Sequence, residues 1–69
     1  MMYTDGNIIV EARLMTDVEY FREFDNDPNY PDDDPKIGMF VYYNDESRIS
    51  YEFYPNVEKF HERFKPFNR

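Results

Sequence analysis

The residues with the strongest potential for chemistry lie in one short stretch, residues 25–36, which holds five aspartates and three prolines. Asp25, Asp27 and Asn29 have the spacing of the first three ligand positions of an EF-hand calcium loop. The rest of the stretch departs from that pattern: a tyrosine stands where the loop needs glycine, and a lysine stands where it needs a bidentate glutamate. We expect no specific calcium site, and a weak calcium-binding module is kept only as an alternative.

Other catalytic or metal-binding patterns are sparse. The chain has no cysteine, and Ser47 and Ser50 fall in a predicted turn and strand with no evident base partner. Glu58, His61 and Glu62 place three potential ligands on one predicted helix, but a carboxylate-bridged di-metal site needs such a motif from two helices. The sequence therefore predicts that the protein is not an enzyme and holds no metal or cofactor.

The charge of the chain is concentrated in one part. The whole sequence has 15 acidic and 8 basic residues and a net charge of -7. Residues 17–34, which we call the acidic segment, contain eight acids and a single base, Arg22, so this segment alone accounts for the net charge. Such a charge argues against unaided binding to nucleic acid or to an anionic membrane. The acids are Asp17, Glu19, Glu23, Asp25, Asp27, Asp32, Asp33 and Asp34.

Length and composition favour one small folded domain, residues 1–69, interrupted by an acidic, proline-rich loop at 25–36. The chain has seven phenylalanines and seven tyrosines, and such large rings let a short chain build a core. The first residues resemble neither a secretory signal nor a transmembrane segment. We therefore expect a cytoplasmic protein.

The first half predicts a strand followed by a helix. Residues 8–15 alternate, with Ile8, Val10, Ala12 and Leu14 on one side and Ile9, Glu11, Arg13 and Met15 on the other. Thr16 begins a capping-box pattern with Glu19, so a helix is expected from there to Phe24 or Asp25. Residues 1–3 are expected to be a frayed end or a short extra strand.

The second half predicts two strands, 37–43 and 48–54, and an amphipathic helix that starts near Pro55 and ends at Pro66. For the apolar sides of the two strands to share a face, Tyr43 must pair with an odd-numbered residue such as Ile49, which needs an odd loop or a bulge. The expected core includes Phe21, Phe53, Phe60 and Phe64.

These elements give the order β-α-β-β-α. The predicted fold class is α+β, with a three-stranded, mainly antiparallel sheet and both helices packed on one face. Lys36, Phe40, Val41 and Tyr43 partly match the RNP1 motif of RNA-recognition domains. That motif belongs on the third strand of its fold, whereas this segment is the second, and the acidity of the chain also counts against RNA.

The charge pattern predicts a non-enzymatic binding protein. If residues 25–34 are extended at about 3.1 Å per residue, their five carboxylates span roughly 28 Å and imitate a phosphate row, although more sparsely. Such a segment would dock on a basic, nucleic-acid-binding groove of a larger protein and block it. Tyr20 and Tyr30 would serve as aromatic anchors beside the eight acids.

In size, charge and lack of cysteine the chain resembles the small inhibitors that phages direct against host nucleic-acid enzymes, such as restriction and CRISPR effectors. That resemblance implies nucleic-acid mimicry in the host cytoplasm. One alternative is an antitoxin or a small adaptor that docks through an aromatic sheet face at Phe40, Tyr42 and Tyr54. An ordinary solvated surface is the simplest alternative for the acidic segment. A homodimer stays open as well.

Overall fold

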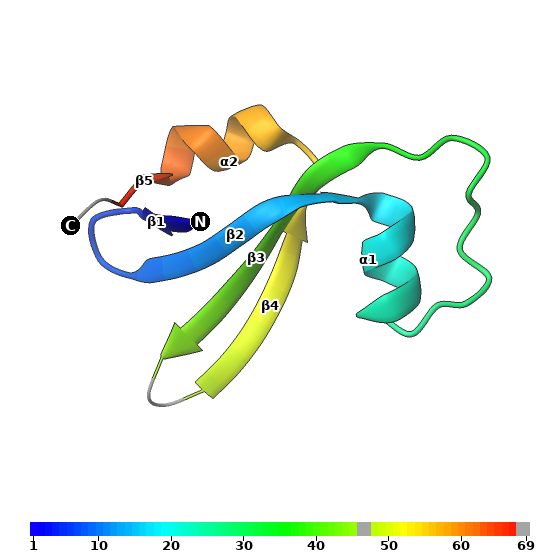
Figure 1. Cartoon of the computed structure of the whole chain (residues 1–69), viewed down its shortest axis with the longest axis horizontal. Coiled ribbons are helices and arrows are strands. Elements are labelled where there is room, and N and C mark those ends of the chain that lie inside the picture. Colours follow the sequence, from blue (N-terminus) through cyan, green and yellow to red (C-terminus); the bar gives the residue numbers. More distant parts are fainter. Residues whose placement is uncertain (46–47, 68–69) are drawn as a thin grey trace.

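The computed structural model describes residues 1–45 and 48–67, which form one five-stranded antiparallel sheet and two short helices (Figure 1). In chain order the elements are β1 (Met2–Thr4), β2 (Ile9–Thr16), α1 (Asp17–Glu23), β3 (Ile37–Asp45), β4 (Arg48–Tyr54), α2 (Val57–Arg63) and β5 (Lys65–Pro66). The strands lie in the order β4-β3-β2-β1-β5. The α+β class is confirmed, but the prediction of three strands is wrong.

The first additional strand, β1, forms a hairpin with β2, with Tyr3 opposite Val10. The turn between them is stabilised by the Asp5 carboxylate, whose Oδ1 accepts hydrogen bonds from the backbone N–H groups of Asn7 and Ile8 at 2.9 and 3.0 Å. Gly6 lies in the left-handed region with φ of 98°, which glycine adopts without steric cost. The turn residues thus convert the N-terminus into a paired strand.

The second additional strand, β5, follows α2 directly. The helix ends before Pro66, and the chain continues in extended geometry, so that Lys65 and Pro66 pair with Thr4 and Tyr3. The backbone N–H of Phe67 also donates to the carbonyl of Met2 at 2.9 Å. The two ends of the described chain therefore lie side by side at one edge of the sheet (Figure 1).

The register between β3 and β4 differs from the expected one. Tyr43 pairs with Ser50, and Tyr42 pairs with Tyr51, so the predicted odd-numbered partner for Tyr43 is wrong. Because paired residues in an antiparallel sheet point to the same side, Tyr51 and Phe53 lie on the face of Phe40 and not on the face of Val41. Both faces of the sheet consequently carry large apolar side chains.

The two helices cover opposite faces, which corrects the prediction that both pack on one face. α2 buries Phe60 and Phe64 against the face that carries Val10 and Val41. α1 places Tyr20 against the other face, in a cluster with Met15 and Phe40. The physical reason is the register, because it gives each face of the sheet its own row of apolar residues to cover.

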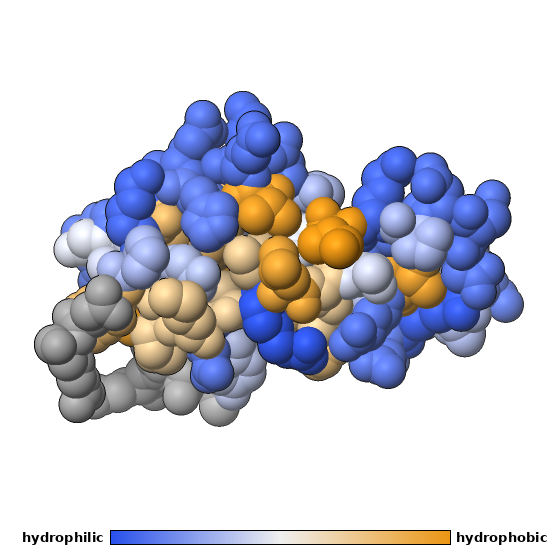
Figure 2. All heavy atoms as spheres, turned by 45° about the horizontal axis from the view of Figure 1, so that its top comes forward, coloured by the Kyte–Doolittle hydropathy of each residue, from blue (hydrophilic) through white to orange (hydrophobic). Residues whose placement is uncertain are grey.

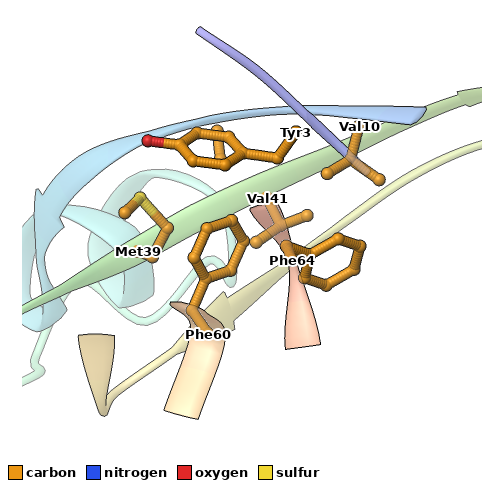
Figure 3. Close-up of a cluster of buried hydrophobic side chains, with 7 residues drawn as sticks. Tyr3, Val10, Met39, Val41, Phe60 and Phe64 are labelled. Atoms are coloured by element: carbon orange, nitrogen blue, oxygen red, sulfur yellow. The ribbon is translucent and has the colours of Figure 1, made fainter. Parts of the chain in front are cut away.

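The α2 side forms the closed part of the core (Figure 3). Phe60, Phe64 and Val41 have no measurable exposure, and Val10 is 1% exposed. The Phe60 and Phe64 rings stack with their centroids 5.0 Å apart, and the Tyr3 ring meets Phe60 edge-on at 5.0 Å. The sequence prediction that Phe60 and Phe64 are core residues is confirmed.

The α1 side is less closed. Phe40, Met15 and Tyr20 are buried, whereas Phe21 and Phe53 are only half-buried, so the prediction of full core positions for the last two is wrong. The Tyr20 and Phe53 rings stack at 5.1 Å. This side of the molecule is held largely by contacts between aromatic rings.

Candidate functional site: the acidic segment

The acidic segment begins with a helix whose start was correctly predicted. The Thr16 hydroxyl caps α1 by accepting a hydrogen bond from the backbone N–H of Glu19 at 3.1 Å. The helix ends at its C-cap Phe24, whose N–H donates to the carbonyl of Tyr20. Asp17 and Glu19 in the first turn stabilise the positive end of the helix dipole.

Asp17 joins this helix to both the middle and the end of the proline-rich loop. Its Oδ2 accepts from the Tyr30 hydroxyl at 2.9 Å, and its Oδ1 accepts from the backbone N–H of Lys36 at 2.9 Å. The backbone N–H of Asp17 in turn donates to the Lys36 carbonyl at 2.9 Å. One carboxylate therefore closes a loop of nearly twenty residues.

These contacts favour the charged form of Asp17. The hydrogen bond from the Lys36 backbone, with a smaller contribution from the Tyr30 hydroxyl, lowers the pKa of the Asp17 carboxyl. The same contact raises the pKa of Tyr30, because the phenol donates to a carboxylate. At neutral pH both groups are in the protonation states that the closed loop requires.

A second set of contacts fixes the middle of the loop onto α1. Arg22 donates from Nε to the carbonyl of Tyr30 at 3.0 Å and lies 3.5 Å from the Asp32 carboxylate. The Tyr30 ring stacks on Phe21, with centroids 4.8 Å apart and ring planes 24° from parallel. The loop is thus held to the helix by an ion pair, a hydrogen bond and a ring stack.

The first half of the loop is a turn and not an extended strap. The backbone N–H of Asp27 returns to the carbonyl of Phe21 at 2.9 Å, and Asn26 has a positive φ of 54°. Asp27 also accepts from the backbone N–H groups of Asn29 and Tyr30, through Oδ1 at 3.3 Å and through its carbonyl at 3.1 Å. The straight row of five carboxylates expected from the sequence is therefore absent.

The eight acids of the segment divide into two groups. Five carboxylates are engaged within the fold: Asp17 and Asp27 hold the loop as described, Glu19 lies 3.7 Å from Arg13, Asp32 pairs with Arg22, and Asp34 lies 2.9 Å from Lys36 Nζ. The other three are exposed, and no ion pair or side-chain hydrogen bond joins them to the residues whose side chains the structure describes, 1–43 and 50–67: Glu23, Asp25 and Asp33. These three are the carboxylates most accessible to a partner.

The two tyrosines predicted as anchors are not freely presented. Tyr20 is only 9% exposed and lies among the rings beneath the segment. Burial, together with the nearby Asp25 carboxylate, raises the pKa of its phenol. Tyr30 is half-buried, and its hydroxyl is bonded to Asp17. Both rings support the acidic surface from within the fold.

The aromatic face proposed as an alternative interface is divided between the two sides of the sheet. Phe40 is buried on the α1 side, and the half-buried Tyr42 lies on the same side. Tyr54 lies on the α2 side against Phe60. A shallow hollow of about 290 Å³ beside Phe40 and Tyr42 also contains Arg13, whose guanidinium lies 5.6 Å from the centre of the Phe40 ring.

A polar network on the α2 side has a structural role. The Tyr43 hydroxyl donates a hydrogen bond to the Glu52 carboxylate. Burial of the phenol raises the pKa of Tyr43, and the Glu52 carboxylate raises it further. Arg63 donates to the Tyr54 hydroxyl at 2.7 Å and lies 3.6 Å from the Asp5 carboxylate. These contacts join α2 to β4 and to the β1–β2 turn.

The described part of the chain contains no group of three or more histidine, cysteine, aspartate or glutamate residues placed to hold a metal ion. Asp25 and Asp27, the first residues of the calcium pattern, lie in the turn after α1, where Asp27 already accepts a hydrogen bond from Asn29. No helix among the described residues is long and apolar enough to cross a membrane.

One exposed apolar pair was not expected from the sequence. Leu14 alternates onto the side of Val10, and Ile37 onto the side of Val41, so both should be buried, yet they are 59% and 60% exposed. The strand periodicity places them correctly on the α2 side, but α2 does not cover that end of the sheet. The part of the sheet that α2 covers is decided by packing, and the sequence pattern does not specify it.

No family model, no curated protein and no solved structure matches this chain at a significant level.

Proposed function

We propose that this protein is a non-enzymatic binding protein that docks its acidic segment on a basic, nucleic-acid-binding surface of a larger protein and blocks that surface. The observation that carries the proposal is the way in which the loop is fixed. Asp17, Arg22 and Tyr30 hold it against α1 through hydrogen bonds, an ion pair and a ring stack. A surface that is ordered before binding loses less conformational entropy when it binds.

The proposed mimicry uses a compact acidic surface and not an extended row of charges. The acidic segment presents a compact surface with Glu23, Asp25 and Asp33 accessible, in place of a linear copy of a phosphate row. A compact acidic surface competes for the same cationic groove through charge complementarity, which mainly accelerates association and confers specificity. Phage-type inhibitors of restriction or CRISPR effectors are the kind of protein that this proposal describes.

The proposal is tested with purified nucleic-acid-binding effectors of restriction and CRISPR systems. Binding is measured by surface plasmon resonance over a series of salt concentrations, and DNA release from the effector is measured by electrophoretic mobility shift. We expect tight binding that excludes DNA, with an association rate that falls as salt rises. Simultaneous binding of DNA and this protein to the effector would contradict the proposal.

The charge variants are chosen from the structure. A triple variant, Glu23→Gln with Asp25→Asn and Asp33→Asn, removes three charges that take no part in the fold, and it should slow association markedly. The control, Glu58→Gln with Glu62→Gln, removes two exposed charges from α2 and should leave association almost unchanged, with the loss in each variant compared per charge removed. Equal loss in both variants would indicate a general effect of net charge and not a docking surface.

A further inference from the structure

Two large aliphatic side chains are exposed at the base of the acidic segment. Leu14 in β2 and Ile37 in β3 are 59% and 60% exposed, more than any other large hydrophobic side chain among the described residues except the terminal Met1. A chain this short has few large aliphatic residues with which to build a core, so exposing two of them together calls for a cause other than stability.

The two residues are neighbours on one face. Leu14 pairs with Met39, and Ile37 pairs with Thr16 on the adjacent strand, so all four lie at the same end of the β2–β3 pair. Leu14, Ile37 and Met39 point to the α2 side, but α2 packs farther along the sheet, over Val41 and its neighbours. Figure 2 shows hydrophobic residues gathered at the middle of the molecule, with hydrophilic surface on both sides.

A shallow hollow of about 180 Å³ lies at this position. It is lined by Leu14, Ile37, Met15, Thr16 and Glu19. Its lining combines apolar side chains with one carboxylate, Glu19, which lies 3.7 Å from Arg13 between partly exposed side chains. Such an exposed ion pair is weak, so this carboxylate can turn to a cationic partner at little cost.

The topology places this hollow beside the acidic segment. The segment leaves the sheet at Thr16, two residues after Leu14, and the loop that completes it returns to the sheet at Ile37. The backbone pairing of Asp17 with Lys36 holds these two points together. Glu19, in the first turn of α1, belongs to the segment and also lines the hollow, so a partner that contacts the start of the segment reaches the hollow as well.

We propose that Leu14 and Ile37 form the apolar anchor of the docking surface and receive one aliphatic or aromatic side chain from a partner surface rich in arginine and lysine. This inference rests on the proposed function and names the partner chemistry of the same site. Interfaces concentrate their affinity in a few buried apolar contacts surrounded by polar groups, and Tyr20 and Tyr30 do not provide such a contact.

The negative charge of the neighbouring acidic segment favours one of the three possible occupants of the hollow. A second copy would bring another acidic segment next to the first, since each hollow lies at the base of a segment with a net charge of -7. A nucleic acid would meet the same repulsion. A protein surface with an apolar side chain among basic residues fits both the hollow and its surroundings.

The experiment uses two synthetic peptides rich in lysine and arginine, which differ only in a central leucine or serine. Their binding to the whole protein is followed by changes in amide chemical shift at low ionic strength. We expect the leucine peptide to bind about tenfold more tightly, as burial of most of one leucine side chain implies. Its shifts should include the residues that line the hollow.

The variant Leu14→Thr with Ile37→Thr should lose the preference for the leucine peptide and keep the binding of the serine peptide, because the acidic surface is unchanged. Ile9→Thr is the matched control, since Ile9 lies in the same strand and is 45% exposed but does not line the hollow. It should keep the full preference.

The two peptides are compared on the unmodified protein, so this part of the test does not depend on whether the variants fold. Equal, salt-sensitive binding of both peptides would overturn the anchor and leave the acidic docking surface in place. Binding of neither peptide would overturn both. A preference for leucine that persists in the Leu14→Thr, Ile37→Thr variant would place the anchor elsewhere and would also overturn this inference.

Discussion

The two faces of the sheet are built in different ways. On the α2 side, Phe60, Phe64, Val41 and Val10 are essentially inaccessible to water, and the rings pack directly against the strands. On the α1 side, Met15, Tyr20 and Phe40 are buried among the side chains that the structure describes, and the half-buried rings around them lie next to a polar loop. The α2 side is a closed hydrophobic core. The α1 side is a partly open layer of aromatic rings, which we call the platform.

The difference separates the side of the molecule that supplies most of its stability from the side that we propose for binding. Burial of apolar area is the main source of stability, and most complete burial is on the α2 side. The acidic segment on the other side is held by Asp17, Arg22 and Tyr30, whose contacts are directional and partly exposed. Changes in the acidic surface should therefore alter binding with little effect on folding.

The largest effect should come from the closed side. Phe60→Ala removes a ring with no exposure and should lower the free energy of unfolding by about 3–5 kcal/mol. A domain of this size has roughly 3–10 kcal/mol in total, so the variant should be largely unfolded at 37 °C in a thermal melt followed by circular dichroism. A native-like melt would contradict the assignment of this side as the main core.

Gly38→Ala should give the next largest effect. A Cβ at Gly38 would overlap both the Phe53 ring and the carbonyl oxygen of Tyr54, and the backbone contact cannot be relieved by rotating a side chain. We expect a loss of about 1–3 kcal/mol, measured by urea denaturation. Gly6→Ala is the comparison, because the space there is open and only the positive φ opposes the substitution. A smaller loss of stability at Gly38 than at Gly6 would mean that β3 and β4 are packed less closely.

Phe21→Ala tests the platform and should cost less than Phe60→Ala. Phe21 is half-buried, so we expect about 1–2 kcal/mol, in the range of ordinary substitutions. Because the Tyr30 ring stacks on it, the amides of the loop should exchange with solvent faster than in the unmodified protein, while the α2 side keeps its protection. A cost equal to that of Phe60→Ala would erase the contrast between the two sides.

Asp17→Asn should have the smallest global effect and a local one that depends on pH. The pKa of Asp17 is lowered in the folded state, so its charged form stabilises the closed loop above the ordinary carboxyl value of about 4. That contribution is lost as the pH falls through the lowered value. The rates of amide exchange in the loop are compared between the unmodified protein and the Asp17→Asn variant by nuclear magnetic resonance. Their difference should be constant near neutral pH and vanish in acid. A difference that grows in acid would refute the role of the charge.

Much of the local structure could be predicted from the sequence. Thr16 and Glu19 correctly located the start of α1, and the alternation in residues 8–15 and 37–43 correctly predicted two of the strands. Phe60 and Phe64, spaced one turn apart, correctly predicted the buried side of α2. These features depend on interactions between residues close in the chain, which the sequence pattern records directly.

The arrangement of the two faces depended on tertiary structure. The pairing of Tyr43 with Ser50 moved Tyr51 and Phe53 to the side opposite Val41, and a shift of one residue in register has this effect on every side chain of a strand. The short strands β1 and β5 also pair across the length of the chain. The register and the pairing of β5 leave no local signal in the sequence, whereas the alternative of a short extra strand at residues 1–3 is confirmed by β1.

For the candidate site, the sequence by itself determined that all the net charge lies in residues 17–34, because charge depends only on composition. The tertiary structure alone decided which carboxylates are engaged. Asp17 is drawn inward by Tyr30 and Lys36, whereas Glu23, Asp25 and Asp33 stay exposed. It also left Leu14 and Ile37 exposed, because α2 packs over Val41 and its neighbours, and the part of a sheet that a helix covers is fixed only when the two pack together.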